Sequence, residues 1–206
     1  MSGIHQHILQ AAIEAGYLDR DRPLAAVVDT TGLAATISSL QRAFPENFNH
    51  TFAAKANTMR GALAFVKAQR MGCEVASPGE LEQALRAGFE AEKIVYDEPA
   101  KTMPMLEKVL VLGVGLNIDN FQEFERVKSL LCKNSSRSRI GFRVNPQVGA
   151  GKICAMSTAT ATSKFGFPLE DDGNRAAIIE AYREHPWLTS LHTHVGSQGC
   201  SLELMC

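Results

Sequence analysis

Lys55 is the residue of this sequence whose surroundings most directly suggest chemistry. It follows the apolar run Phe52-Ala53-Ala54 within HTFAAKAN, residues 50–57. A strand that is buried on both faces reads as a continuous apolar run, and a charged residue inside one is disfavoured. A lysine at the end of such a strand is therefore either a structural residue in a salt bridge or a reactive amine. On these eight residues alone the structural interpretation is favoured.

Polar residues also stand at the ends of the other strand-like runs. These residues are Glu74, Asp97, Asp119, Arg143 with Asn145, and His192 with His194. In a β/α barrel the active site lies at the carboxyl ends of the strands, so we expect these side chains to meet at one rim. A lysine that loses its hydration at such a rim has a lowered pKa and becomes a nucleophile toward aldehydes.

Pyridoxal phosphate (PLP) is the aldehyde cofactor that uses a lysine in this way, through a Schiff base that serves as an electron sink. The segment HTHVGSQG offers an imidazole for one face of the cofactor ring. In the same segment, Gly196 and Ser197 offer backbone and hydroxyl groups that a phosphate could approach. These residues offer some of the parts that a PLP site needs.

Six strand-like runs alternate with helical segments from residue 50 onward. The runs start at His50, Cys73, Lys93, Val114, Arg139 and Leu188. This alternation predicts a parallel sheet with right-handed crossovers, either doubly wound or curved into a barrel. A barrel is favoured, because no GxGxxG turn follows the first strand as a dinucleotide-binding fold requires. Since a closed barrel of this kind has eight strands, we expect an α/β fold with an incomplete barrel.

Residues 1–45 lead into this barrel, and residues 46–206 form it. We expect the leading segment to contain a short amphipathic helix, a strand-like run at residues 23–29 and a second helix, LAATISSLQRAF. Within the barrel, residues 146–166 are the one long irregular stretch, rich in small and hydroxyl residues. Loops of this length are usually functional or disordered, so this stretch is either an active-site lid or a flexible linker.

The overall composition argues against several classes of partner. A formal net charge of −1 gives no electrostatic reason to expect nucleic acid or a membrane surface. No apolar run approaches the roughly 20 residues of a membrane helix, and no secretory signal opens the chain, so we expect a cytoplasmic protein. The five cysteines are scattered without CxxC spacing, which predicts reduced thiols and no metal site.

Seven motifs in order carry a resemblance to a known family. They are FAAKAN, CEVASPGEL, YDEPAK, GLNIDN, FRVNPQVG, TSKFG and HTHVGSQG. Together they resemble the N-terminal half of the diaminopimelate/ornithine/arginine decarboxylases, which are PLP enzymes on an alanine-racemase-like barrel. The HxHxGSQ form is most similar to diaminopimelate decarboxylases. The resemblance implies a partial (β/α)8 TIM barrel with about six of its eight β/α units.

The resemblance also implies roles for individual residues. Lys55 matches the catalytic lysine that carries PLP, and His194 matches the residue stacked on the pyridine ring. Arg143 matches an arginine near the cofactor, and Ser197 beside Gly196 matches the phosphate-binding hydroxyl. Further possible site residues are Glu74, Asn145, His192, and Lys164, the last matching a lysine at the family's dimer interface. No metal is implied.

The implied activity is PLP-dependent decarboxylation of an amino acid by a homodimer. The family supplies its glycine-rich phosphate loop and the carboxylate for the ring nitrogen from strands seven and eight, which this sequence lacks. We therefore expect a truncated or fragment form with impaired activity. The alternatives are a non-catalytic PLP-binding or regulatory barrel, and a related decarboxylase or racemase acting on lysine, ornithine or a D-amino acid. An inactive decoy subunit would be expected to lack the lysine, and Lys55 is present.

Overall fold

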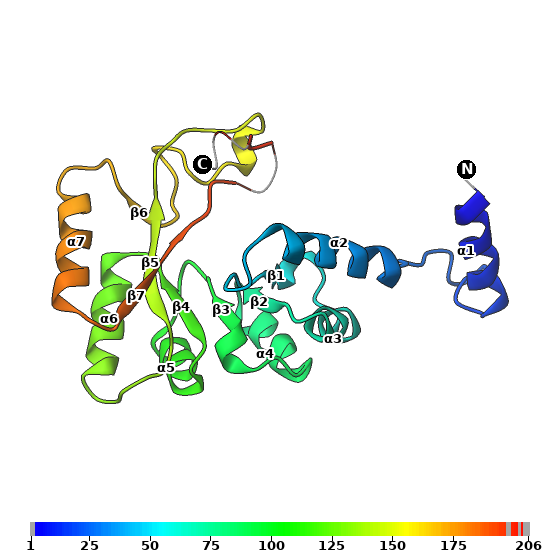
Figure 1. Cartoon of the computed structure of the whole chain (residues 1–206), viewed down its shortest axis with the longest axis horizontal. Coiled ribbons are helices and arrows are strands. Elements are labelled where there is room, and N and C mark those ends of the chain that lie inside the picture. The colour runs from blue at the N-terminus through cyan, green and yellow to red at the C-terminus, as the bar shows by residue number, and fades with distance from the viewer. Residues whose placement is uncertain (1–2, 197–198, 202, 204–206) are drawn as a thin grey trace. The chain divides into compact units, whose positions relative to one another are not determined.

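The chain forms two compact units, Met1–Phe44 and Pro45–Cys206. The structure is a computed structural model that describes residues 3–196, 199–201 and 203. Within that part of the chain, every strand belongs to the second unit (Figure 1). No helix among the described residues is long and apolar enough to cross a membrane.

The first unit contains two helices, α1 (Gly3–Glu14) and α2 (Thr30–Ala43). Asp29 caps α2, because its carboxylate accepts two backbone N–H bonds from the first turn, at 2.9 and 3.0 Å. The strand predicted at residues 23–29 is wrong, since this segment has no regular structure and Leu24 is 90% exposed. A strand needs a neighbour for its backbone N–H and C=O groups, and no strand among the described residues pairs with this segment.

The second unit is built on a parallel sheet of seven strands in the order β1-β2-β3-β4-β5-β6, with β7 also paired to β5. The strands are β1 (Thr51–Ala53), β2 (Gly72–Val75), β3 (Ile94–Tyr96), β4 (Gly115–Ile118), β5 (Ile140–Asn145), β6 (Phe167–Pro168) and β7 (Leu188–Thr193). All six predicted strands are confirmed, and the short β6 is an addition. Among the described residues β1 and β7 are not paired with each other, so the sheet is open and the partial barrel is confirmed.

Helices connect successive strands and lie beside the strands that they join (Figure 1). The α-helices are α3 (Arg60–Ala68), α4 (Pro78–Arg86), α5 (Met103–Leu112), α6 (Phe121–Leu131) and α7 (Asn174–Glu184). Three short 3-10 helices are η1 (Ala54–Ala56), η2 (Ala91–Lys93) and η3 (Cys154–Met156). This order of elements is the repeated β/α unit that the alternating sequence predicts.

Side-chain caps explain where two of these helices begin. The Ser77 hydroxyl accepts from the Glu80 backbone N–H at 3.2 Å, and the Glu80 carboxylate accepts from the Ala76 N–H at 2.8 Å. This reciprocal arrangement satisfies backbone donors that the first turn of α4 would leave unpaired. Asn120 caps α6 in the same manner, by accepting from the Glu123 N–H at 2.9 Å.

Aromatic rings fill the space between the sheet and the last two helices. Phe142 of β5 lies 5.3 Å from Phe124 of α6 and 5.6 Å from Tyr182 of α7, measured between ring centroids. Phe167 of β6 packs on the same Phe142 ring at 4.5 Å. Burial of rings of this size is a major part of the free energy that holds helices against a sheet. Alternate residues of β5 must then face away from these helices.

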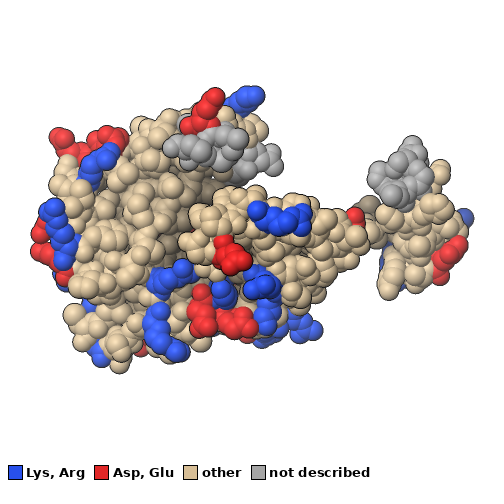
Figure 2. Space-filling view, viewed as in Figure 1, with Lys and Arg blue, Asp and Glu red and all other residues tan. Residues whose placement is uncertain are grey.

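Charged side chains of both signs lie close together on the outside of the second unit. Glu82 of α4 pairs with Arg86 at 2.8 Å and with Lys108 of α5 at 3.8 Å. On the face of the unit shown in Figure 2, Lys and Arg side chains alternate with Asp and Glu side chains, without a continuous patch of either sign. Pairs this exposed contribute little to stability.

One ion pair differs from these, because it is buried. Lys101, in the connection between β3 and α5, lies 2.9 Å from Glu123 of α6, and their side chains are 0% and 3% exposed. Glu123 also accepts from the backbone N–H of Asp119, at 2.8 Å. The pair therefore ties the end of β4 and the start of α6 to the segment that follows β3.

We predict that Lys101→Ala lowers the free energy of unfolding by about 3–5 kcal/mol, because it leaves the Glu123 carboxylate buried without its counter-charge. The matched control is Lys108→Ala, which breaks the exposed pair with Glu82 and is expected to cost less than about 1 kcal/mol. Urea unfolding followed by circular dichroism measures both. Equal losses in the two variants would contradict this account of the buried pair.

Candidate functional site

The face of the sheet opposite to Phe142 is polar. Side chains alternate between the two faces of a strand, so Arg143 and Asn117 point away from the helix-packed side. Strand register places Arg143 opposite His192 of β7, and Asn117 opposite Gly141 of β5. The rim residues predicted from separate strands are thereby brought together at the carboxyl ends of β3, β4, β5 and β7.

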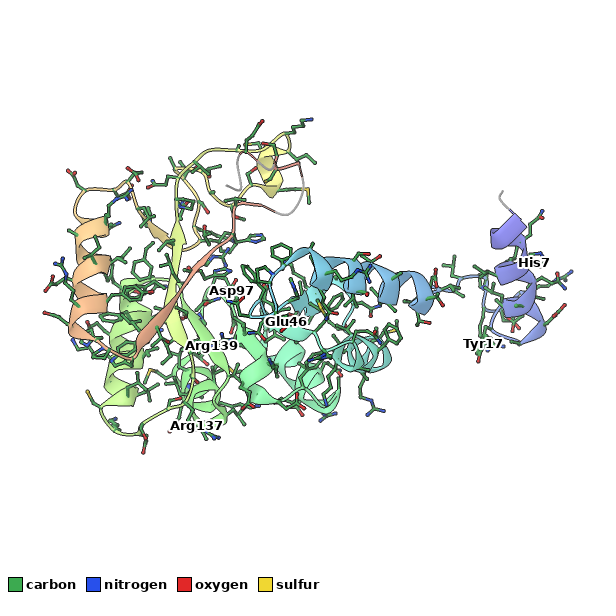
Figure 3. All side chains as sticks on the ribbon, in the orientation of Figure 1. His7, Tyr17, Glu46, Asp97, Arg137 and Arg139 are labelled. Carbon is green, nitrogen blue, oxygen red and sulfur yellow. The ribbon has the colours of Figure 1, made fainter. Side chains whose placement is uncertain are left out.

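An ion pair between Arg143 and Asp97 occupies the centre of this face. The Arg143 Nη1 atom lies 3.0 Å from Asp97 Oδ2. The other oxygen, Oδ1, accepts from Asn117 Nδ2 at 3.2 Å and lies 3.5 Å from His192 Nδ1. On the other side of the guanidinium, Asp119 Oδ1 is 3.8 Å from Arg143 Nε. In Figure 3 the labelled Asp97 lies toward the carboxyl ends of the strands.

The charged side chains of this cluster are buried. The side chains of Asp97, Asp119 and Arg143 are 8%, 6% and 7% exposed, so two carboxylates share one guanidinium. Among the described residues, Asp119 Oδ1 and His192 Nδ1 are buried atoms without a hydrogen-bond partner. Burial raises the pKa of Asp119, and the Gly166 N–H and the Arg143 charge offset part of that rise.

The TSKFG segment, residues 162–166, packs against Arg143. The Phe165 ring centroid lies 4.8 Å from the Arg143 guanidinium carbon, which is a cation–π distance. Gly166 has φ +71°, and a Cβ atom there would lie 2.8 Å from the Arg143 carbonyl oxygen. Only glycine adopts this conformation at so close an approach without strain. The adjacent Lys164 is exposed, with its amine 5.1 Å from the Phe165 ring.

Lys55 lies in η1, directly after β1, and its side chain is exposed. Over the part of the chain that the structure describes, no hydrogen bond or ion pair engages its amine. The salt-bridge interpretation of Lys55 is therefore not supported. Its charge still reaches Glu74 and His194, because it lowers the pKa of both groups.

Burial raises the pKa of Glu74 but lowers the pKa values of the two histidines, His192 and His194. Burial and the neighbouring Asp97 charge raise the pKa of Glu74, despite the opposing charges of Lys55 and Arg143. Burial lowers the pKa of His192 and of His194, and the Arg143 charge adds to the effect. Both imidazoles are therefore neutral at pH 7.

The hydroxyl-rich loop is fastened to the end of β7. The Thr158 backbone N–H donates to the Val195 carbonyl at 3.0 Å, and the Thr158 hydroxyl donates to the His194 carbonyl. Ser157 forms an antiparallel bridge with Gly196. Residues 146–166 were expected to be either an active-site lid or a flexible linker, and these bonds argue against the flexible linker.

The remaining predicted residues have distinct positions. Asn145 holds the loop, since its Nδ2 donates to the Thr160 carbonyl at 2.9 Å and its Oδ1 accepts from the Gln147 N–H at 3.0 Å. Gly196 is closely packed, because a Cβ there would lie 2.7 Å from Cys200 Sγ. Ser197 lies outside the described residues.

Three contributors to the site were missed in the sequence. Asn117 alternates with Asp119 in GLNIDN, and this two-residue spacing could have placed it on the same face. Phe165 and Thr158 had no local signal, because their contacts depend on how the long loop folds back on β5 and β7.

A family model described as the pyridoxal binding domain of pyridoxal-dependent decarboxylases matches residues 31–204. Diaminopimelate decarboxylase of Bacteroides thetaiotaomicron is 30% identical over 173 residues, which are 82% of this chain and 45% of that protein. The enzyme of the same name from Methanothermobacter thermautotrophicus is 32% identical over 178 residues, 83% of this chain and 40% of that protein. The chain thus spans less than half the length of these relatives.

Solved structures give the same result for the fold. Diaminopimelate decarboxylase from Helicobacter pylori, complexed with L-lysine, superimposes with a TM-score of 0.77 at 25% identity, over 86% of this chain and 45% of that one. Lysine/ornithine decarboxylase from Vibrio vulnificus, complexed with putrescine, has a TM-score of 0.71 at 21% identity, over 96% of this chain and 47% of that one, and shares the fold.

The lowered pKa values of His192 and His194 predict how stability depends on pH. A histidine whose pKa is lower in the folded than in the unfolded state takes up its proton preferentially on unfolding. The free energy of unfolding should therefore fall as the pH drops through the ordinary histidine value of 6.5, and the loss is complete below the folded pKa values.

Urea unfolding at pH 7.5, 6.5 and 5.5 measures this dependence. We expect it to be weaker in the His192→Gln/His194→Gln double variant, and unchanged in His7→Gln, which alters an exposed histidine of the first unit. The same pH slope in the wild type and the double variant would refute the assignment.

Proposed function

The chain belongs to the pyridoxal-dependent decarboxylases through their pyridoxal-binding domain, and on this premise we propose that it is the cofactor-binding part of a diaminopimelate decarboxylase-like enzyme. The observation that carries the proposal is the Lys55 amine, which no described residue engages and whose charge acts on Glu74 and His194. By contrast, the buried Lys101 is paired with Glu123.

The residues present fit part of a PLP molecule, which is an aldehyde with a flat ring and a phosphate. Lys55 offers the amine for the aldehyde, and His194 offers a flat, neutral imidazole for the ring. Arg143 offers a buried cation, held at 3.0 Å by Asp97, for an anionic oxygen. Bound to a lysine, the cofactor supplies a sink for the electron pair that remains when an amino acid loses its carboxylate.

His194 would orient the cofactor rather than exchange a proton with it. A neutral ring can lie against another flat ring without adding charge to it, and burial keeps His194 neutral at pH 7. Thr158 holds the His194 backbone through its hydroxyl, which fixes the position from which the ring projects. The loop therefore contributes to the site by supporting His194.

Glu74 is a carboxyl group with a raised pKa on which the charge of Lys55 acts. A carboxyl whose pKa is raised by burial can hold a proton at higher pH than a solvated one. We assign it the role of holding or receiving a proton beside the lysine amine. The His192 Nδ1 atom lies 3.5 Å from Asp97 Oδ1.

The relatives support a proposal for the substrate class. The Helicobacter pylori and Vibrio vulnificus structures hold L-lysine and putrescine, both of which carry amino groups. We assign this site a small amino acid with a second amino group, and the parent enzyme a homodimer to which the exposed Lys164 contributes. Cys73, Cys132 and Cys154 are free thiols, in keeping with a cytoplasmic enzyme.

A second candidate is a PLP-binding chain without decarboxylase activity. One observation favours it: the sheet is open, so that β7 is paired only with β5 in the described residues. In the described residues an open edge leaves backbone N–H and C=O groups of β7 without a strand partner, whereas two further β/α units cover this edge in an eight-stranded barrel.

We predict that the 206-residue chain binds added PLP and that Lys55→Ala abolishes the new absorbance band of the bound cofactor, because it removes the amine that directly follows β1 and that no described residue pairs. The control is Lys133→Ala, an exposed lysine that follows α6 near the amino ends of the strands. It should bind PLP as the wild type does. A band that persists in Lys55→Ala, in folded protein, would contradict the proposed function.

A further inference from the structure

Asp97 is the point at which four strands of the polar face are connected. It follows β3 directly, and its carboxylate is approached by Asn117 of β4, Arg143 of β5 and His192 of β7. Its own backbone N–H donates to the Val75 carbonyl at the end of β2, at 2.8 Å. The carboxylate is therefore fixed from its backbone as well as from its oxygens.

The two oxygens of Asp97 have different partners. Oδ2 accepts the charge-assisted bond from Arg143 at 3.0 Å, whereas Oδ1 accepts from Asn117 at 3.2 Å and faces the His192 ring at 3.5 Å. A carboxylate with both oxygens occupied in this way cannot rotate without breaking a bond. The same two hydrogen bonds fix the orientation of Arg143 and Asn117.

Asp119 does not perform the same function for Arg143. Its Oδ1 lies 3.8 Å from Arg143 Nε, beyond hydrogen-bond distance, and has no hydrogen-bond partner among the described residues. Asp97 is thus the carboxylate that hydrogen-bonds the guanidinium, while the Phe165 ring covers it at 4.8 Å.

We infer that Asp97 is a positioning residue of the cofactor site, which holds the Arg143 guanidinium through Oδ2 and presents Oδ1 to the His192 ring. The role rests on the proposed function in one respect, namely that this polar face is where PLP binds. The positioning itself concerns only residues of this chain, and can be measured without the cofactor.

The charges around His192 make the role observable. The groups that face it are Asp97 directly after β3, Arg143 from β5, His194 directly after β7 and Lys101 from the segment after β3. Of these, only the Asp97 carboxylate favours the charged imidazole, and the other three disfavour it. Removal of the Asp97 charge must therefore lower the pKa of His192 further.

The first experiment is an NMR titration of the imidazole signals in the 206-residue chain without cofactor. In Asp97→Asn we expect the pKa of His192 to fall below its wild-type value. In Asn117→Ala we expect it to rise, because Asp97 Oδ1 loses a competing donor and becomes available to the imidazole. Asp171→Asn, an exposed carboxylate that accepts from Gln147 at 3.1 Å, is the control and should leave the His192 titration unchanged.

The opposite signs make the inference falsifiable even if one variant fails to fold. An unchanged His192 titration in either folded variant would overturn the role of Asp97 toward His192. Asn117→Ala separates positioning from charge alone, because it keeps the Asp97 carboxylate and changes only the bond that holds Oδ1.

The second experiment measures PLP affinity for the same variants by absorbance between pH 6 and 8. We expect Asp97→Asn to weaken PLP binding about tenfold, as the loss of a charge-assisted hydrogen bond to Arg143 predicts, and to alter its pH profile. Wild-type affinity in Asp97→Asn would overturn the positioning role. If the wild type itself does not bind PLP, the proposed function fails, while the imidazole titration still decides the role of Asp97.

Discussion

The ion pair between Arg143 and Asp97 is the interaction on which the polar face of this sheet depends. It joins β5 to the end of β3 across β4, with both side chains buried and their atoms 3.0 Å apart. Either charge alone would be buried without a counter-charge, which costs several kcal/mol. The pairing is possible because parallel strands bring their carboxyl ends to one edge, where residues 46 positions apart become neighbours.

Lys55 is distinguished by standing outside that network. Asp97 is hydrogen-bonded to Arg143, and Glu123 is paired with Lys101. No described carboxylate pairs with the Lys55 amine, whose charge lowers the pKa of Glu74 and of His194. An amine in this setting is available for a covalent bond to an aldehyde, which is the chemistry of a pyridoxal-binding domain.

Local patterns in the sequence predict the strands, the helices and the composition of the rim, because apolar runs, caps and alternation act over a few residues. They predicted a strand at residues 23–29 wrongly, since a strand also requires a partner elsewhere in the chain. They could not pair Lys101 with Glu123, or place Thr158 against His194. Those contacts depend on the register of strands and the path of a long loop, which tertiary packing decides.

Peptide mapping of the chain after reduction of bound PLP with borohydride tests the central claim most directly. Reduction makes the bond between cofactor and amine permanent, so mass spectrometry locates the modified residue. The account predicts one dominant site, Lys55, at a PLP concentration close to that of the protein. Modification spread over exposed lysines, or concentrated at another lysine, would contradict a cofactor site at the end of β1.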